Sequence, residues 1–248
     1  MHTDSPPRII RLDETPSTNL YLREYLQKEP LPEGSVVVAR SQTAGRGQAG
    51  NTWEAAPGEN LTFSLVIYPS TTPASRQFII SQTVALALKE TLDDYTDGIS
   101  IKWPNDMYRH DRKICGVLIE NSLAGREIQS SIIGIGLNLN QTRFTGNAPN
   151  PVSLRQITGK TYDKDEVLKH FLTVFYSYYL LLLEEKEDEL RAAYRAALYR
   201  GDGTFYTFSD AAGRFDARIE DVEPSGHLVL RLRDDQKRRY AFKEISYH

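Results

Sequence analysis

Apolar residues recur along the chain with two different periods. Between residues 61 and 67, apolar side chains occupy every second position, starting from Leu61. This is the period of a β-strand with one covered face. Between residues 80 and 92, an apolar residue stands at every fourth position, as on a helix that lies against a sheet. The chain is therefore predicted to combine strands and helices.

The N-terminal part predicts a helix followed by a strand. Ser17 is a good helix N-cap, and residues 18–29 after it have a helical pattern. Proline lacks a backbone donor and restricts the residue before it, so this helix is expected to end at Pro30. The apolar run 34–40 then predicts a buried strand.

Three further runs predict an antiparallel meander. The runs are 99–103, 113–120 and 127–139, and short polar loops separate them. The loop after the first run is highly charged. The order of the elements indicates an α+β fold.

A long helical pattern follows from residue 163 to residue 200. Asp163, with Glu166 three residues later, resembles a capping box. One face of this run is apolar, which indicates core or a partner-facing edge rather than a cofactor site. The residues on that face are Val167, Phe171, Val174 and Tyr178.

The C-terminal part predicts a small β-barrel of about 45 residues. Four short strand-like pieces are separated by turn signals, and no low-complexity linker precedes them. We therefore predict two packed domains, 1–198 and 199–248. The four pieces are residues 204–209, 214–222, 227–233 and 237–242.

Composition excludes several classes of protein. The 248 residues are 40% hydrophobic and 25% charged, as in an ordinary globular protein. A formal net charge of −3 offers no basic face, so no DNA partner is expected. Cys115 is the single cysteine, and it is expected to be a buried, inert thiol. No stretch has the length and apolarity of a leader or membrane span, so a soluble, cytoplasmic protein with no membrane contact is expected.

A glycine-rich stretch at residues 45–50 is the first candidate for chemistry. Gly45, Gly47 and Gly50 match G-x-G-x-x-G, and the same stretch matches a phosphate loop without its lysine. A dinucleotide fold would start a helix here, whereas Trp53 and an alternating strand follow. The backbone N–H groups could still surround an anion. A hairpin loop without a ligand is the alternative.

Other catalytic templates find no support. The five histidines have no metal-ligand spacing, and neither C-x-x-C nor H-E-x-x-H occurs. A G-x-S-x-G nucleophile elbow is also absent from the sequence. Zinc enzymes and α/β-hydrolases are therefore not expected.

Six motifs in combination change this picture. Their order along nearly the whole chain resembles the biotin protein ligases of the type that lacks an N-terminal DNA-binding domain. "KWPND" followed by K-x-x-G is specific for this family, whereas the glycine-rich loop alone is not. The motifs are "STN" at 17–19, "GRGQAGNTW" at 45–53, "KWPND" at 102–106, "KICGVLIE" at 113–120, "IGIGLNLN" at 133–140 and "KEISYH" at 243–248.

The resemblance implies a fold and a reaction. The fold would be a mixed, largely antiparallel sheet flanked by helices, as in class II synthetases, with a small SH3-like barrel at the C-terminus. Such enzymes join biotin to the α-phosphate of ATP, with Mg²⁺, to give biotinyl-5'-AMP and pyrophosphate. They then pass biotin to a lysine of a biotin carboxyl carrier protein or a biotin-accepting carboxylase domain.

The resemblance also assigns site residues. Lys113 and Arg46 would be catalytic, because two anions must meet and need positive charge around them. Asp106 would organise either Mg²⁺ or a lysine. Trp103 is interpreted as a packing residue. The biotin site would comprise Ser17, Thr18, Asn19, Gln42, Arg46, Gly47, Gln48, Lys113 and Gly116, and the ATP site Arg46, Gln48, Trp53, Lys102, Asn105, Lys113 and Asn138.

Two other functions stay open beside the biotin ligase. A lipoate or octanoate ligase or transferase could share the fold, although "KWPND" favours biotin. A biotin-responsive DNA-binding repressor would need an additional helix-turn-helix module, and 16 residues precede Ser17. A homodimer formed through an exposed strand edge of the meander is also possible.

Overall fold

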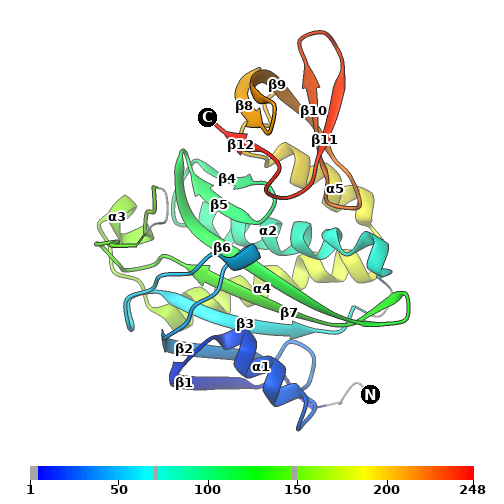
Figure 1. Cartoon of the computed structure of the whole chain (residues 1–248). Coiled ribbons are helices and arrows are strands. Elements are labelled where there is room, and N and C mark those ends of the chain that lie inside the picture. Colours follow the sequence, from blue (N-terminus) through cyan, green and yellow to red (C-terminus); the bar gives the residue numbers. More distant parts are fainter. Residues whose placement is uncertain (1–4, 70–71, 147–149) are drawn as a thin grey trace.

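A largely antiparallel sheet of seven strands forms the frame of the molecule (Figure 1). The computed structural model describes residues 5–69, 72–146 and 150–248, and in these ranges the strand order is β1-β2-β3-β7-β6-β5-β4. Strands β1 and β2 run parallel, and the other neighbours run antiparallel. The predicted α+β fold with a mixed sheet is confirmed. The strands are β1 (Ile9–Thr15), β2 (Val36–Gln42), β3 (Leu61–Ile67), β4 (Ile99–Lys102), β5 (Asp106–Arg109), β6 (Arg112–Ala124) and β7 (Glu127–Leu137).

The central strand β3 is buried on both faces, although its sequence predicts one covered face. Leu65 packs in a large core with helices α2 and α4, whereas its neighbour Val66 packs in a smaller core with α1. Successive side chains of a strand point to opposite faces, so α1 lies across the sheet from α2 and α4. Ser64 is therefore buried on the α1 face. The helices are α1 (Thr18–Leu26), α2 (Phe78–Asp93) and α4 (Lys164–Leu183).

The predicted meander contains one more strand than its sequence indicates. The expected charged loop after β4 forms β5, which pairs with both β4 and β6. Met107 and Tyr108 in β5 are buried, and their burial stabilises a strand too short to give a periodic signal. Strand β1 was also not predicted, because it lies at the sheet edge and is mostly exposed. Cys115 is buried and free, as predicted.

The helices follow the predictions with shifted ends. Helix α1 ends at Leu26 rather than just before Pro30, since Lys28 N already closes a turn on Tyr25 O. The helical run after Asp163 is divided at Glu185, whose φ is +59°. Asp163 caps α4 by accepting from the backbone amides of Asp165 and Glu166, which confirms it as the N-cap, although the reciprocal bond from the Glu166 side chain that a capping box requires is not formed. The apolar face of α4 packs in the large core. After the division the chain continues as α5 (Glu187–Ala196). A short helix, α3 (Leu154–Thr158), was not predicted.

A second sheet of five strands, in the order β11-β10-β9-β8-β12, lies at the end of the larger sheet near β4 (Figure 1). It fits the predicted SH3-like unit, with a fifth strand, β12, beyond the four predicted pieces. The domain boundary between residues 198 and 199 stays a prediction. The strands are β8 (Tyr206–Asp210), β9 (Gly213–Val222), β10 (Leu228–Leu232), β11 (Lys237–Tyr240) and β12 (Ser246–Tyr247).

Two contacts attach the small sheet and the end of α5 to the larger sheet. Trp103 Nε1 donates to Gly226 O at 2.9 Å, which confirms that this tryptophan is a packing residue. Ile101 N donates to Ala197 O at 2.9 Å. This bond pairs part of the edge strand β4 with the segment after α5. The homodimer through an edge of the meander stays a prediction. The other edge of the sheet is β1.

Candidate active site

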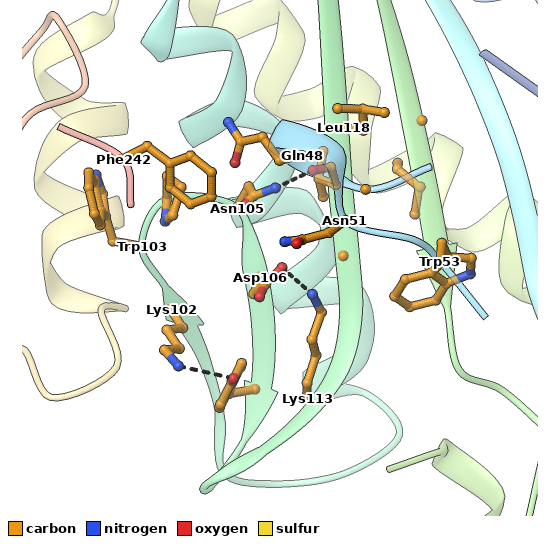
Figure 2. A pocket seen from close by; sticks show the side chains of 18 of the residues that line it. Gln48, Asn51, Trp53, Lys102, Trp103, Asn105, Asp106, Lys113, Leu118 and Phe242 are labelled. Carbon is orange, nitrogen blue, oxygen red and sulfur yellow. Dashed lines mark hydrogen bonds and ion pairs between the residues drawn. The ribbon is translucent and has the colours of Figure 1, made fainter. Parts of the chain in front are cut away.

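A cavity of about 770 Å³ lies where the larger sheet meets the small one. Part of its lining is shown in Figure 2. Almost every residue that the sequence assigned to biotin or ATP lines this one cavity. The lining comes from the start of α1, the loop 45–53, strands β4 to β7, residues 199–200 and the tail 242–248.

The first end of the cavity is a buried, neutral cluster at the start of α1. Ser17, Thr18 and Asn19 are all less than 5% exposed. Thr18 N donates to Gln42 Oε1 at 2.8 Å, and the Ser64 hydroxyl donates to Asn19 Oδ1 at 2.6 Å. Ser17 occupies the N-cap position, but its side chain makes no capping bond. These polar groups are thus held in place on the cavity wall rather than used only to begin the helix.

Glycines on β6 and β7 form the floor of the cavity. A Cβ added at Gly134 would lie 2.3 Å from Asn19 Oδ1, and one at Gly136 would lie 2.2 Å from the Trp53 ring. Gly116 lies directly opposite Gly136 in the sheet, and its Cβ would lie 3.2 Å from the same ring. These positions let side chains approach the backbone closely. The biotin contact implied for Gly116 stays a prediction.

The loop 45–53 forms a small hairpin over this floor. Gly47 N donates to Asn51 O at 2.6 Å, and Trp53 N donates to Gly45 O at 3.0 Å. Arg46 extends from the hairpin and pairs with Glu120 on β6 at 2.5 Å. The loop is therefore neither a dinucleotide-binding turn nor a phosphate loop of the usual kind.

The second end of the cavity carries positive charge. Lys113 Nζ lies 2.7 Å from Asp106 Oδ1, and Figure 2 shows the two side chains turned toward each other. Lys113 Nζ also lies 5.8 Å from the centre of the Trp53 ring. Asn105 Nδ2 donates to Val117 O, which joins the "KWPND" turn to β6. The end of β4 and the start of β6 thus bring Lys102 and Lys113 into one cavity.

Lys102, another cation of this end, is half-buried. Its Nζ donates to the Tyr108 hydroxyl at 3.1 Å and lies 5.0 Å from the centre of the Tyr247 ring. Burial lowers the pKa of Lys102, and the charges of Lys113 and Arg200 lower it further, while Asp106 opposes them. A phosphate in the cavity would relieve this repulsion between the cations.

Asn138 is the predicted site residue that the structure does not bring to the cavity. Its side chain is buried, and Nδ2 lies 3.5 Å from Lys113 O. Asn138 directly follows β7, and its polar partner is the backbone of a site lysine.

Several residues of the site were not predicted. Tyr108, Tyr199, Arg200, Phe242 and Tyr247 line the second end of the cavity. The "KEISYH" tail supported the family resemblance, but its residues were given no role. Glu120 was also missed, although it belongs to the "KICGVLIE" motif.

Some buried polar atoms at the cavity have no partner within the described residues. They are Gln48 Oε1, Trp53 Nε1 and the Tyr247 hydroxyl. Buried polar groups are nearly always hydrogen-bonded in folded proteins. Unpartnered groups along a cavity wall therefore indicate a ligand-binding site.

The metal prediction rests on Asp106 alone. Within residues 5–69, 72–146 and 150–248, no group of three or more His, Cys, Asp and Glu side chains is arranged to hold a metal ion. Asp106 instead pairs with Lys113, which is the second of the two roles predicted for it. Among the helices in the described part of the chain, none is long and apolar enough to cross a membrane.

Comparison with known proteins identifies the same family as the sequence motifs. The model of the biotin/lipoate A/B protein ligase family matches residues 11–138. The chain is 32% identical to the biotin--[acetyl-CoA-carboxylase] ligase of Paracoccus denitrificans, over 89% of this chain and 92% of that protein. It is 28% identical to the bifunctional ligase/repressor BirA of Bacillus spizizenii, over 94% of this chain and 72% of BirA.

Solved structures agree with the sequence relatives. The biotin protein ligase from Aquifex aeolicus in complex with biotin and ATP superposes with a TM-score of 0.79 and 26% identity, covering 97% of this chain and 98% of that one. The same enzyme without ligands superposes with a TM-score of 0.74. The chain therefore belongs to the biotin/lipoate A/B protein ligase family, and within that family to the biotin protein ligases.

Proposed function

We propose that the cavity binds biotin at its neutral end and ATP at its cationic end. A biotin carboxylate oxygen attacks the α-phosphorus of ATP, biotinyl-5'-AMP forms and pyrophosphate leaves. The amine of an acceptor lysine then attacks the biotinyl carbonyl, an amide forms and AMP leaves. The observation that carries this proposal is the arrangement of Lys113, Lys102 and Arg46 around one cavity whose other end is neutral and buried.

The neutral end is proposed to bind the ring system of biotin. The ureido group of that ring has two N–H donors and one carbonyl acceptor, so it needs fixed polar partners of both kinds. Ser17, Thr18, Asn19 and Gln42 offer hydroxyl and amide groups there. The contact between Thr18 and Gln42 at 2.8 Å limits their freedom before biotin arrives. Because these groups are already ordered, binding costs less conformational entropy.

The cationic end is proposed to stabilise the reacting phosphate. Lys113 would bridge the biotin carboxylate and the α-phosphate, and Asp106 holds its ammonium in position at 2.7 Å. Negative charge grows on the non-bridging oxygens during attack, so a fixed ammonium binds the transition state more strongly than the reactants. Arg46, Gly47 and Gln48 would close over the carboxylate and phosphates from the hairpin.

The nucleotide is proposed to lie near Trp53 and Asn105. The indole ring lies on the glycine floor within 5.8 Å of Lys113 Nζ, where an adenine could stack on it. Asn138 is proposed to act from outside the cavity, through the backbone of Lys113.

A magnesium ion that arrives with ATP fits the residues present. Mg²⁺ commonly takes one or two carboxylates and completes its shell with phosphate oxygens and water. Asp106, which is 24% exposed in its side chain and faces the cavity, would offer that carboxylate. When bound, the ion would neutralise phosphate charge.

The acceptor and the assembly are inferred in the same way. A biotin carboxyl carrier protein or a biotin-accepting carboxylase domain would supply the lysine, and both it and ATP favour a cytoplasmic location. A homodimer would use β1, where Ile9 is 50% exposed on the sheet edge. With a net charge of −3, sequence-specific DNA binding is not expected.

One experiment separates biotin from the related substrates. The protein is incubated with ATP, Mg²⁺ and either biotin or lipoate, and pyrophosphate release is measured. We expect release with biotin and a tightly held biotinyl-5'-AMP, which then labels an added carrier domain. Release with lipoate and not with biotin would contradict the proposed substrate.

A further inference from the structure

Glu120 on β6 joins two side chains of the site, Asn19 and Arg46, to Arg23 of α1, and it has no role in the scheme above. Its Oε2 accepts from Asn19 Nδ2 at 2.8 Å. Its Oε1 is paired with two guanidinium groups, Arg46 at 2.5 Å and Arg23 of α1. One carboxylate thus contacts Asn19 at the neutral end of the cavity, Arg46 of the hairpin and Arg23 farther along α1.

The contact with Asn19 fixes the orientation of that amide. The Ser64 hydroxyl donates to Asn19 Oδ1 at 2.6 Å, which leaves the amide nitrogen as the donor toward β6. That nitrogen donates to Leu118 O at 3.2 Å and to Glu120. Gly134 allows this approach, because a Cβ there would overlap Asn19. Glu120 therefore completes the set of partners that holds a proposed biotin-binding residue.

The two arginines make the contact with Arg46 exchangeable. The Glu120 side chain is 25% exposed and that of Arg46 is 41% exposed. Burial alone would raise the pKa of Glu120, but the bonds from Asn19 and Arg23 and the two positive charges keep it below its ordinary value. If Arg46 moves away, Arg23 and Asn19 still compensate the charge, so no unpaired, half-buried carboxylate remains.

We propose that Glu120 is a positioning residue of the ligase reaction, which holds Arg46 over the empty cavity and releases it to the substrates while Arg23 stays as the counter-ion. This inference rests on the proposed role of Arg46. Substrate anions would replace Glu120 as the partner of Arg46. The hairpin would therefore already lie near its closed position before the substrates bind.

Trypsin tests the first half of this proposal in the empty protein. The protease cuts after Arg46 only when the arginine side chain enters its specificity pocket, so a pair with Glu120 slows the cut. In Glu120→Gln we expect cleavage of the 46–47 bond, followed by mass spectrometry, to become about two- to fivefold faster, as befits a partly exposed ion pair. Glu120→Asp, which keeps the charge, should restore slow cleavage.

A matched control comes from the small sheet. Glu220 also pairs with two cations, Arg231 and Lys237, so Glu220→Gln makes the same chemical change away from the hairpin. It should leave cleavage after Arg46 unchanged. Equal rates in wild type and Glu120→Gln would overturn the proposal.

Arg23→Met separates positioning from simple support of the fold. This change leaves Arg46 as the sole arginine on Glu120, so cleavage after Arg46 should be unchanged or slower. If Glu120→Gln and Arg23→Met accelerate cleavage alike, Glu120 supports only the fold, and the proposal is wrong.

Kinetics test the second half of the proposal. Glu120 keeps its bond to Asn19 after Arg46 leaves, so Glu120→Gln removes the charge from that bond and should raise KM for biotin about two- to tenfold, while kcat stays within a factor of about two. A loss confined to kcat would contradict this. A protein without biotin-dependent pyrophosphate release would refute the proposed function instead, and the trypsin results would still stand.

Discussion

The two ends of the cavity are built from different interactions. At the α1 end, Thr18 and Asn19 are buried and make short bonds to Gln42 and Ser64 on the sheet, and Asn19 also donates to the Glu120 carboxylate. At the other end, Lys102 and Lys113 each have a polar partner but remain close to one another's charge. The first arrangement is stable without a ligand, whereas the second is completed by anions. We therefore propose that the neutral end orients the substrate and that the cationic end supplies the chemistry.

The largest expected effect is on the cationic end. Lys113→Ala should slow single-turnover pyrophosphate release by about 10²–10³, the usual value of one fixed donor at a developing charge. Affinity for biotin, measured separately by calorimetry, should change far less. The reason is that the interaction between the ammonium and the phosphate strengthens as negative charge grows on the phosphate, after biotin has bound.

The control for Lys113 is Lys89→Ala, which removes a lysine that pairs with Asp93 on α2. It should leave the rate unchanged. If Lys113→Ala keeps its rate within a factor of about three while Lys102→Ala abolishes release, the principal cation is Lys102.

The next effect is on the neutral end. Gly134→Ala places a Cβ 2.3 Å from Asn19 Oδ1, so Asn19 must leave its position. We expect the Kd for biotin to rise about tenfold or more, since forced overlap in a packed region typically costs about 1–3 kcal/mol. Isothermal titration with biotin alone measures it.

Gly116→Ala is the matched change at the other end. Its Cβ would meet the Trp53 ring at 3.2 Å and the end of the Lys113 side chain at 3.3 Å, and a flexible side chain can yield. Biotin affinity should change by less than about threefold. Equal losses in both variants would show that the two ends do not act separately.

A smaller effect concerns the dependence of ATP binding on pH. Burial lowers the pKa of Lys102, so this lysine loses its charge at a lower pH than an ordinary lysine. The loss of charge weakens its electrostatic attraction to phosphate. KM for ATP should accordingly rise on the alkaline side. Tyr247→Ala removes the ring that covers Lys102, admits water and should move this rise to higher pH.

Lys102→Arg serves as the control for that titration. Arginine keeps its charge throughout the accessible range, so the alkaline rise should disappear. An unchanged rise in Lys102→Arg would assign the titration to another group.

The sequence predicted the contents of the site better than its geometry. Periodicity reports local burial, and it located the strands that carry Lys113 and Gly116. It could not predict β5, because four residues are too few for a period, nor the pair between Asp106 and Lys113 that β5 creates. Arg200 and Tyr247 reach the cavity only through the packing of the small sheet, which no local pattern records. Most site roles came from the family resemblance, and Asn138 shows its limit, since its side chain contacts the backbone behind the cavity.

The smallest effect on catalysis is expected at Trp103, which follows Lys102 directly but belongs to the packing between the sheets. Trp103→Phe removes the bond to Gly226 O and keeps an aromatic ring near Phe242. The free energy of unfolding should fall by about 0.5–1.5 kcal/mol, the net value of one hydrogen bond, while kcat stays within a factor of about two. Phe242→Leu is the counterpart, because it removes the ring contact and leaves the hydrogen bond. Urea unfolding and single-turnover kinetics on both variants distinguish the roles. If Trp103→Phe lost more than tenfold in kcat at unchanged stability, Trp103 would act in the reaction, and the division between the chemical end and the packing behind it would lie elsewhere.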